Sequence, residues 1–95
     1  MIRAGSVDDL HVGKWSVHLV RTGDTYGRTG SLTHDDPTPL VEFYDTTDGQ
    51  MVTRYYADTL LDVTGGLSLN GGVPEWTVSA EDMRVVVDWL KRETS

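Results

Sequence analysis

Residues 79–93 read SAEDMRVVVDWLKRE, and every local signal in this stretch predicts an α-helix. Ser79 precedes a carboxylate three positions later, which is the pattern of an N-terminal capping box. Acidic residues open the stretch and basic residues close it, as the helix dipole favours. Apolar side chains recur at i, i+3, i+4 and i+7, on one helical stripe made of Met83, Val86, Val87 and Leu90. We therefore expect an amphipathic helix that packs on the rest of the fold.

Val85 and Trp89 are a second apolar pair on this helix, about 120–160° from the main stripe by helix geometry. Two interpretations stay open. The large indole broadens the core face, or the two side chains form a separate face that meets a partner. An exposed tryptophan is a common hot-spot residue at protein interfaces. Trp89 is therefore a candidate partner contact, and the Val85–Trp89 face is a candidate homodimer contact.

Upstream of the helix, residues 40–56 predict a β-hairpin. The runs LVEFYD at 40–45 and QMVTRYY at 50–56 are rich in strand-forming residues. The pair Asp48-Gly49 between them is a strong turn signal, because glycine accepts the positive φ that tight turns need.

Shorter elements complete the expected fold. Alternating apolar residues predict a half-buried strand at 14–21. We also expect strands at 31–33 and 67–69, a helical turn at 57–62 capped by Asp58, an extended segment at 73–78, and frayed or briefly helical residues at 1–10. The predicted fold class is α+β: one domain over residues 1–95, with a small, mostly antiparallel sheet of four to five strands and the C-terminal helix (79–93) packed on it.

The charge is unevenly distributed along the chain. The formal net charge is −7, yet residues 35–82 alone hold ten carboxylates and one basic residue, Arg54. Such a field repels nucleic acid backbones and suits a basic partner surface. Acidic residues also keep small proteins soluble without any partner, so the excess charge alone decides nothing. We expect no direct contact with nucleic acid.

The absence of cysteine excludes disulfides and thiolate metal sites and fits a reducing compartment. No run approaches the roughly 20 apolar residues that a membrane span needs, and the N-terminus lacks the apolar run of a signal peptide. The expectation is a soluble, cytoplasmic protein that does not contact a membrane.

Aromatic residues gather on the predicted hairpin. Alternation separates Phe43 from Tyr44, and Tyr55 from Tyr56, so one face packs in the core. The other face exposes at least one tyrosine beside charged side chains. Tyrosine and arginine are enriched at binding hot spots, although cross-strand aromatic pairs also stabilise sheets by themselves. The candidate partner contacts are Tyr44, Asp45, Arg54, Tyr56, Asp58 and Trp89.

A second candidate site is the glycine-rich loop at 22–30. Backbone N–H groups in such loops cradle phosphate, and Arg21, Tyr26 and Arg28 would assist a nucleotide-like ligand. The spacing matches neither a Walker A loop nor a dinucleotide fingerprint. The alternative is a plain hairpin loop.

Catalytic and metal-binding patterns are weak. His34, Asp35 and Asp36, with His11 and His18, offer metal-type side chains, but no spacing makes three or four of them converge. No serine lies in a nucleophile-elbow context, and carboxylate pairs arise by chance in so acidic a chain. We expect no cofactor, no metal and no enzymatic activity, and we keep a small hydrolase as the third functional alternative.

Three segments, at 41–45, 49–61 and 71–76, resemble small uncharacterised proteins of bacteriophages that infect actinobacteria. The likeness extends over roughly residues 40–90 and lies in the order of segments. It implies a phage context and transfers no functional residue. Small phage proteins of this kind often bind and block a host protein. The leading expectation is therefore an inhibitor that acts in the host cytoplasm on a protein with a basic surface, in a defence or nucleic-acid-handling complex.

Overall fold

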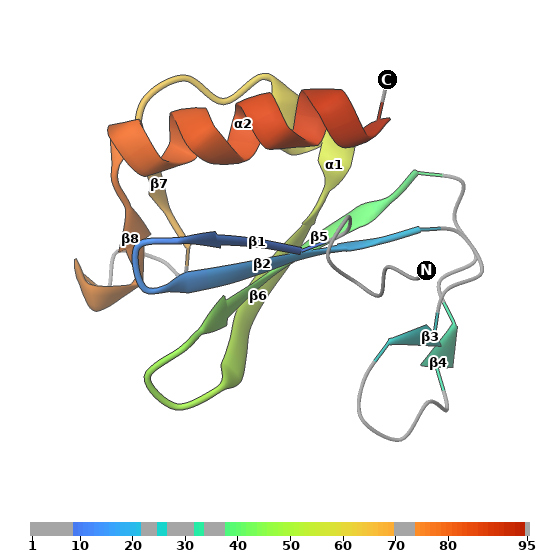
Figure 1. The fold of residues 1–95 in the computed structure, drawn as a ribbon, viewed down its shortest axis with the longest axis horizontal. Coiled ribbons are helices and arrows are strands. Elements are labelled where there is room, and N and C mark those ends of the chain that lie inside the picture. The colour runs from blue at the N-terminus through green and yellow to red at the C-terminus, as the bar shows by residue number, and fades with distance from the viewer. Residues whose placement is uncertain (1–8, 22–24, 27–31, 34–37, 70–73, 95) are drawn as a thin grey trace.

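The computed structural model describes residues 9–21, 25–26, 32–33, 38–69 and 74–94. The described residues form a central antiparallel sheet with helices on one side (Figure 1). In chain order the elements are β1 (Asp9–Val12), β2 (Trp15–Val20), β3 (Thr25–Tyr26), β4 (Leu32–Thr33), β5 (Leu40–Asp45), β6 (Gln50–Tyr56), α1 (Ala57–Leu61), β7 (Leu67–Ser68), the 3₁₀ turn η1 (Pro74–Trp76), β8 (Thr77–Val78) and α2 (Ala80–Thr94). The α+β fold class is confirmed.

The main sheet has the strand order β1-β2-β5-β6, and every neighbouring pair is antiparallel. β1 and β2 are joined by a tight turn in which Gly13 has φ 58°, a value that glycine adopts without steric cost. β5 and β6 form the hairpin predicted from the Asp48-Gly49 signal, and Gly49 has φ 74°. Two further two-stranded sheets, β3–β4 and β7–β8, are not hydrogen-bonded to the main sheet as strands.

The hydrophobic core lies between the main sheet and α2. Phe43 is fully buried at its centre and meets Trp15 and Tyr55 edge to face, at centroid distances of 6.4 and 6.1 Å. The predicted stripe of α2 faces this layer, since Met83, Val86, Val87 and Leu90 are all buried. The alternation predicted for the hairpin is confirmed, because Phe43 and Tyr55 face the core.

The start of α2 follows the capping pattern. The backbone N–H of Asp82 donates to Ser79 Oγ at 3.1 Å, which satisfies one of the N–H groups left over at a helix N-terminus. Glu81 and Asp82 lie in the first turn, and Lys91 and Arg92 in the last. The predicted helix at 79–93 is confirmed within one residue at each end.

The structure decides between the two interpretations of the Val85–Trp89 pair, because the Trp89 indole broadens the core face. Trp89 is only 5% exposed and belongs to the core, whereas Val85 is 42% exposed. The indole is long enough to reach the core from the flank of the stripe, and the short valine is not. Trp89 is therefore not available as a surface contact, and the homodimer predicted through these two residues retains only Val85.

Three local predictions were wrong. Asp9 and Leu10 lie in β1 rather than in a frayed or helical segment. The N-cap of α1 is Tyr56, with no side-chain cap hydrogen bond, so Asp58 is not the cap. The segment at 73–78 was expected to be extended, and Thr77–Val78 do form β8, but Pro74–Trp76 form a 3₁₀ turn, because the fixed φ of proline suits the start of a helical turn.

Candidate functional site

The main sheet has two unlike faces. α1 and α2 lie over one of them (Figure 1), and that face carries the core. The opposite face, here called the open face, carries the alternate residues of the four strands, and no helix in the described part of the chain covers it. The register aligns its residues in three rows: His11, Ser16, Tyr44 and Met51; Asp9, His18, Glu42 and Arg54; and Val20, Leu40 and Tyr56.

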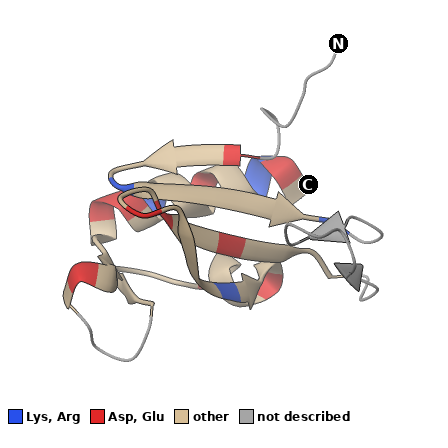
Figure 2. Cartoon of the chain, turned by 90° about the horizontal axis from the view of Figure 1, so that it is seen from below, with Lys and Arg blue, Asp and Glu red and all other residues tan. Residues whose placement is uncertain are grey.

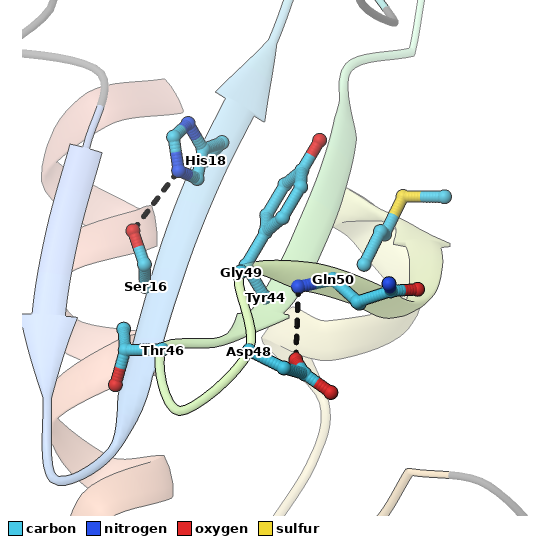
Figure 3. Close-up of a pocket in the computed structure, with 8 residues that line it drawn as sticks. Ser16, His18, Tyr44, Thr46, Asp48, Gly49 and Gln50 are labelled. Carbon is cyan, nitrogen blue, oxygen red and sulfur yellow. Dashed lines mark hydrogen bonds between the residues drawn. The ribbon is translucent and has the colours of Figure 1, made fainter.

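One end of the open face is hollowed. A concavity of about 740 Å³ lies between β2, the end of β5 and the β5–β6 turn. This volume is within the range of protein sites for small ligands. Figure 3 shows the side chains that line it: Ser16, His18, Tyr44, Thr46, Asp48, Gly49, Gln50 and Met51.

His18 is the most connected side chain of the concavity. Its Nε2 atom lies 3.0 Å from Ser16 Oγ, and its Nδ1 atom lies 3.1 Å from an oxygen of the Asp9 carboxylate. Its ring also packs against the ring of Tyr44, at a centroid distance of 4.7 Å. Both ring nitrogens therefore have partners, and these partners hold the imidazole in one orientation.

Glu42 places a carboxylate within the open face. Its residue is only 3% exposed, although it points away from the helices. In the register it stands between His18 on β2 and Arg54 on β6, and the Tyr44 hydroxyl donates to its carboxylate at 3.1 Å. A buried carboxylate is favourable only where charges and hydrogen bonds compensate its lost hydration. Arg54 and the Tyr44 hydroxyl supply such a charge and such a hydrogen bond, and the same hydrogen bond holds the Tyr44 side chain in place.

The β5–β6 turn forms the rim of the concavity and is built on Asp45. The Asp45 carboxylate accepts hydrogen bonds from the Thr47 hydroxyl and from the Thr47 backbone N–H, and Lys14 Nζ lies 3.5 Å away. The Thr47 bonds, with help from the Lys14 charge, hold the pKa of Asp45 below its ordinary value. Asp45 is thus a structural residue of the turn.

Thr46 connects this turn to the β1–β2 turn. Its backbone N–H and its hydroxyl both donate to the Lys14 carbonyl, at 3.0 and 2.7 Å. The register of β5 and β6 shifts between Phe43 and Tyr44, which marks a β-bulge. Bulges bend a strand and increase its twist, and they often lie next to binding sites. The bulge and the joined turns together shape this end of the open face.

The predicted contact residues are spread over different places. Tyr44 lines the concavity, Arg54 lies beside Glu42, and Tyr56 is exposed in the third row of the open face. Asp58 is exposed on α1 and does not belong to the open face. Asp45 is committed to the turn and Trp89 to the core, so the structure brings together only half of the predicted set.

The predicted ligand loop is mostly outside the described residues. Arg28 and the side chain of Tyr26 lie there. Arg21 is described, and its guanidinium pairs with Glu93 Oε1 near the end of α2 at 3.3 Å. Arg21 thus has a structural partner at the C-terminal end of the fold.

Sequence reasoning missed Asp9, Ser16 and His18 as a group. The alternation of polar residues at positions 16 and 18 was visible and puts both on one face of β2. The missing information was β1, whose register brings Asp9 opposite His18. Recognising Gly13-Lys14 as a two-residue turn would have predicted this pairing.

Metal-type side chains do not converge among the described residues, where no three His, Asp or Glu form a group able to hold an ion. Within the same part of the chain, none of the helices has the length and apolar character to cross a bilayer. Comparison with protein-family models, with curated proteins and with solved structures finds no match to the chain.

Proposed function

We propose that this chain is a small protein-binding module whose open face receives a basic segment of a partner protein. The observation that carries the proposal is the concavity on a sheet face that no helix of the described residues covers, with a histidine–tyrosine ring pair in it and the Asp48 carboxylate in its lining. Such a combination of aromatic surface and negative charge suits a lysine or arginine side chain.

Charge complementarity supports a basic partner. Asp9 lies on the open face, and Asp48 lines the concavity from the turn. Figure 2, seen from the side of the open face, shows acidic positions on the strands and on the hairpin turn. With a net charge of −7, the whole chain also attracts a basic surface over a distance, which speeds association.

Exposed apolar surface supports a protein rather than an ion as the ligand. Met51 is 41% exposed and lines the concavity, and Tyr56 is exposed farther along the same face. Methionine and tyrosine are enriched at protein interfaces because they offer adaptable contact area. A basic segment with apolar neighbours would cover both kinds of surface.

The partner we propose is a host protein, and the effect of binding is inhibition. The resemblance of residues 40–90 to small phage proteins supports this role, since such proteins often block host factors. A component of a defence or nucleic-acid-handling complex has the basic groove that an acidic module would fill. The proposal places this binding in the cytoplasm of the host.

A pair of matched variants tests the proposal. Met51→Lys puts a positive charge into the concavity, and Val85→Lys puts the same charge on α2, at a residue of equal exposure (41% and 42%). Immobilised wild-type protein and both variants are incubated with lysate of an actinobacterial host at low and high salt, and retained proteins are identified by mass spectrometry. We expect a basic protein that wild type and Val85→Lys retain at low salt, and that Met51→Lys loses. Retention by all three, or by none, would overturn the proposal.

A further inference from the structure

Asp9, His18 and Ser16 form a continuous chain of polar contacts on the open face. The carboxylate lies 3.1 Å from His18 Nδ1, and the hydroxyl lies 3.0 Å from His18 Nε2. This is the order of groups, acid then imidazole then hydroxyl, by which serine hydrolases activate their nucleophile. The ion pair between Asp9 and His18 does not explain why a serine hydroxyl also lies at Nε2.

The local fold fixes the three groups relative to one another. Ser16 and His18 are two residues apart on β2 and therefore project from the same face. Asp9 stands opposite His18 across the antiparallel β1–β2 pair. Tyr44 packs against the imidazole from β5, so the ring is held on a second side. All three groups come from regular strands, which position side chains more rigidly than loops do.

The protonation pattern follows from these contacts. A carboxylate only accepts hydrogen bonds, so Asp9 selects the tautomer that carries its proton on His18 Nδ1. In that tautomer Nε2 has a free lone pair, and the Ser16 hydroxyl, whose Oγ lies 3.0 Å away, is the group that can donate to it. His18 is thereby set up as a general base, with Asp9 as the positioning residue that keeps the imidazole in this tautomer.

We propose that Ser16 is a nucleophile toward activated acyl groups and that the concavity is an esterase-type site. Ser16 Oγ attacks the carbonyl carbon of an ester while its proton passes to His18 Nε2. The carbonyl reforms, the C–O bond to the leaving group breaks, and Nε2–H returns the proton to the departing oxygen. Water then attacks the acyl-serine, giving a proton to Nε2, and Ser16 Oγ leaves with that proton as the acid is released.

The substrate class follows from what surrounds Ser16. Both Ser16 and His18 line the concavity, so the hydroxyl is reachable from it although the residue is only 8% exposed. The Tyr44 ring and the exposed Met51 side chain offer apolar contact to an aryl or short alkyl group. Backbone N–H groups that pair within the β ladders cannot also stabilise an oxyanion. The site therefore suits esters with good leaving groups, such as 4-nitrophenyl acetate, rather than amides.

The test measures covalent labelling and turnover on the intact protein. A fluorophosphonate reacts as an ester does, with Ser16 Oγ displacing fluoride from phosphorus and His18 taking the proton. Wild type, Ser16→Ala, His18→Gln and Ser68→Ala are incubated with it, and peptide mapping locates the adduct. Ser68 is an exposed serine on β7, which belongs to a separate two-stranded sheet, and its variant is the matched control.

We expect one adduct per chain, on Ser16, in wild type and Ser68→Ala, and none on the other two variants. Hydrolysis of 4-nitrophenyl acetate should fall at least about a hundredfold without His18, as for loss of a general base. Circular dichroism shows whether each variant is folded. In Asp9→Asn, NMR should show that the proton is no longer fixed on His18 Nδ1. The fluorophosphonate should also label Ser16 of this variant more slowly. An unlabelled protein, or an adduct on any residue other than Ser16, would overturn the proposal. Ser16→Ala should still retain the partner protein in the lysate experiment, so a failure of the esterase proposal can be distinguished from a failure of the binding proposal.

Discussion

Replacement of Trp89 by alanine is the sharpest test of how α2 joins the sheet. A buried aromatic side chain removes about 150–250 Å² from water. At about 25 cal/mol per Å² this corresponds to about 4–6 kcal/mol, and measured losses for aromatic-to-alanine changes in cores are about 3–5 kcal/mol. Only 5% of Trp89 is exposed, so nearly the whole of this loss of unfolding free energy applies to Trp89→Ala.

The change is large relative to the stability of a small domain, which is about 5–15 kcal/mol in total. In a chain of this length each kcal/mol lowers Tm by about 4–8 °C. Trp89→Ala should therefore lower Tm by at least about 12 °C, followed by circular dichroism, and Trp89→Phe should lower it by less. Val85→Ala is the control on the same helix, and it should change stability by less than about 0.5 kcal/mol because the side chain is exposed. Equal, small effects of the two alanine variants would refute the position of Trp89 in the core.

Two further predictions concern the helix cap and the β5–β6 turn. Ser79→Ala removes the hydrogen bond to the Asp82 N–H and should cost about 1 kcal/mol in thermal unfolding, whereas Ser79→Asp keeps a cap and should cost less; equal losses would contradict the capping role. Asp45 has a pKa below its ordinary value of 3.8 in the folded state, so its contribution to stability is complete above that value and disappears as the pH falls through the lower, folded pKa. Urea unfolding should therefore show Asp45→Asn to be less stable than wild type near neutral pH, with the gap closing below pH 3.8, and a gap independent of pH would rule out this linkage.

The main elements of the fold were predictable because their signals are local. The α2 stripe, the Ser79 cap and the Asp48-Gly49 turn each depend on residues within a few positions of one another. Local sequence signals did not decide whether Trp89 lies in the core or on the surface. Helix geometry places Val85 and Trp89 on similar flanks, and only the size of the indole and the position of the sheet bury one and expose the other.

The candidate site was less predictable because it depends on strand order. Tyr44 could be assigned to a sheet face from alternation alone. Its ring contact with His18 requires β2 to pair with β5, which lies some twenty residues later in the chain, after β3 and β4 rather than after a tight turn. Asp9 required recognition of β1, a strand of only four residues in which Leu10 and Val12 alternate with two polar residues. Asp45 was predicted as a partner contact, whereas its hydrogen bonds to Thr47 commit it to the turn.

The most direct test of binding at the open face is an NMR titration of the ¹⁵N-labelled protein with a hexa-arginine peptide, with hexa-glutamate as the control peptide. If binding occurs at the open face, hexa-arginine should shift the amide signals of four residues: Ser16, His18, Tyr44 and Met51. The amide signal of Val85 on α2 should not change. The shifts should disappear at high salt, because salt screens the attraction between the charges. Hexa-glutamate should shift none of them. Shifts concentrated on α2, or spread evenly over all acidic positions, would contradict the assignment of the open face as the binding surface.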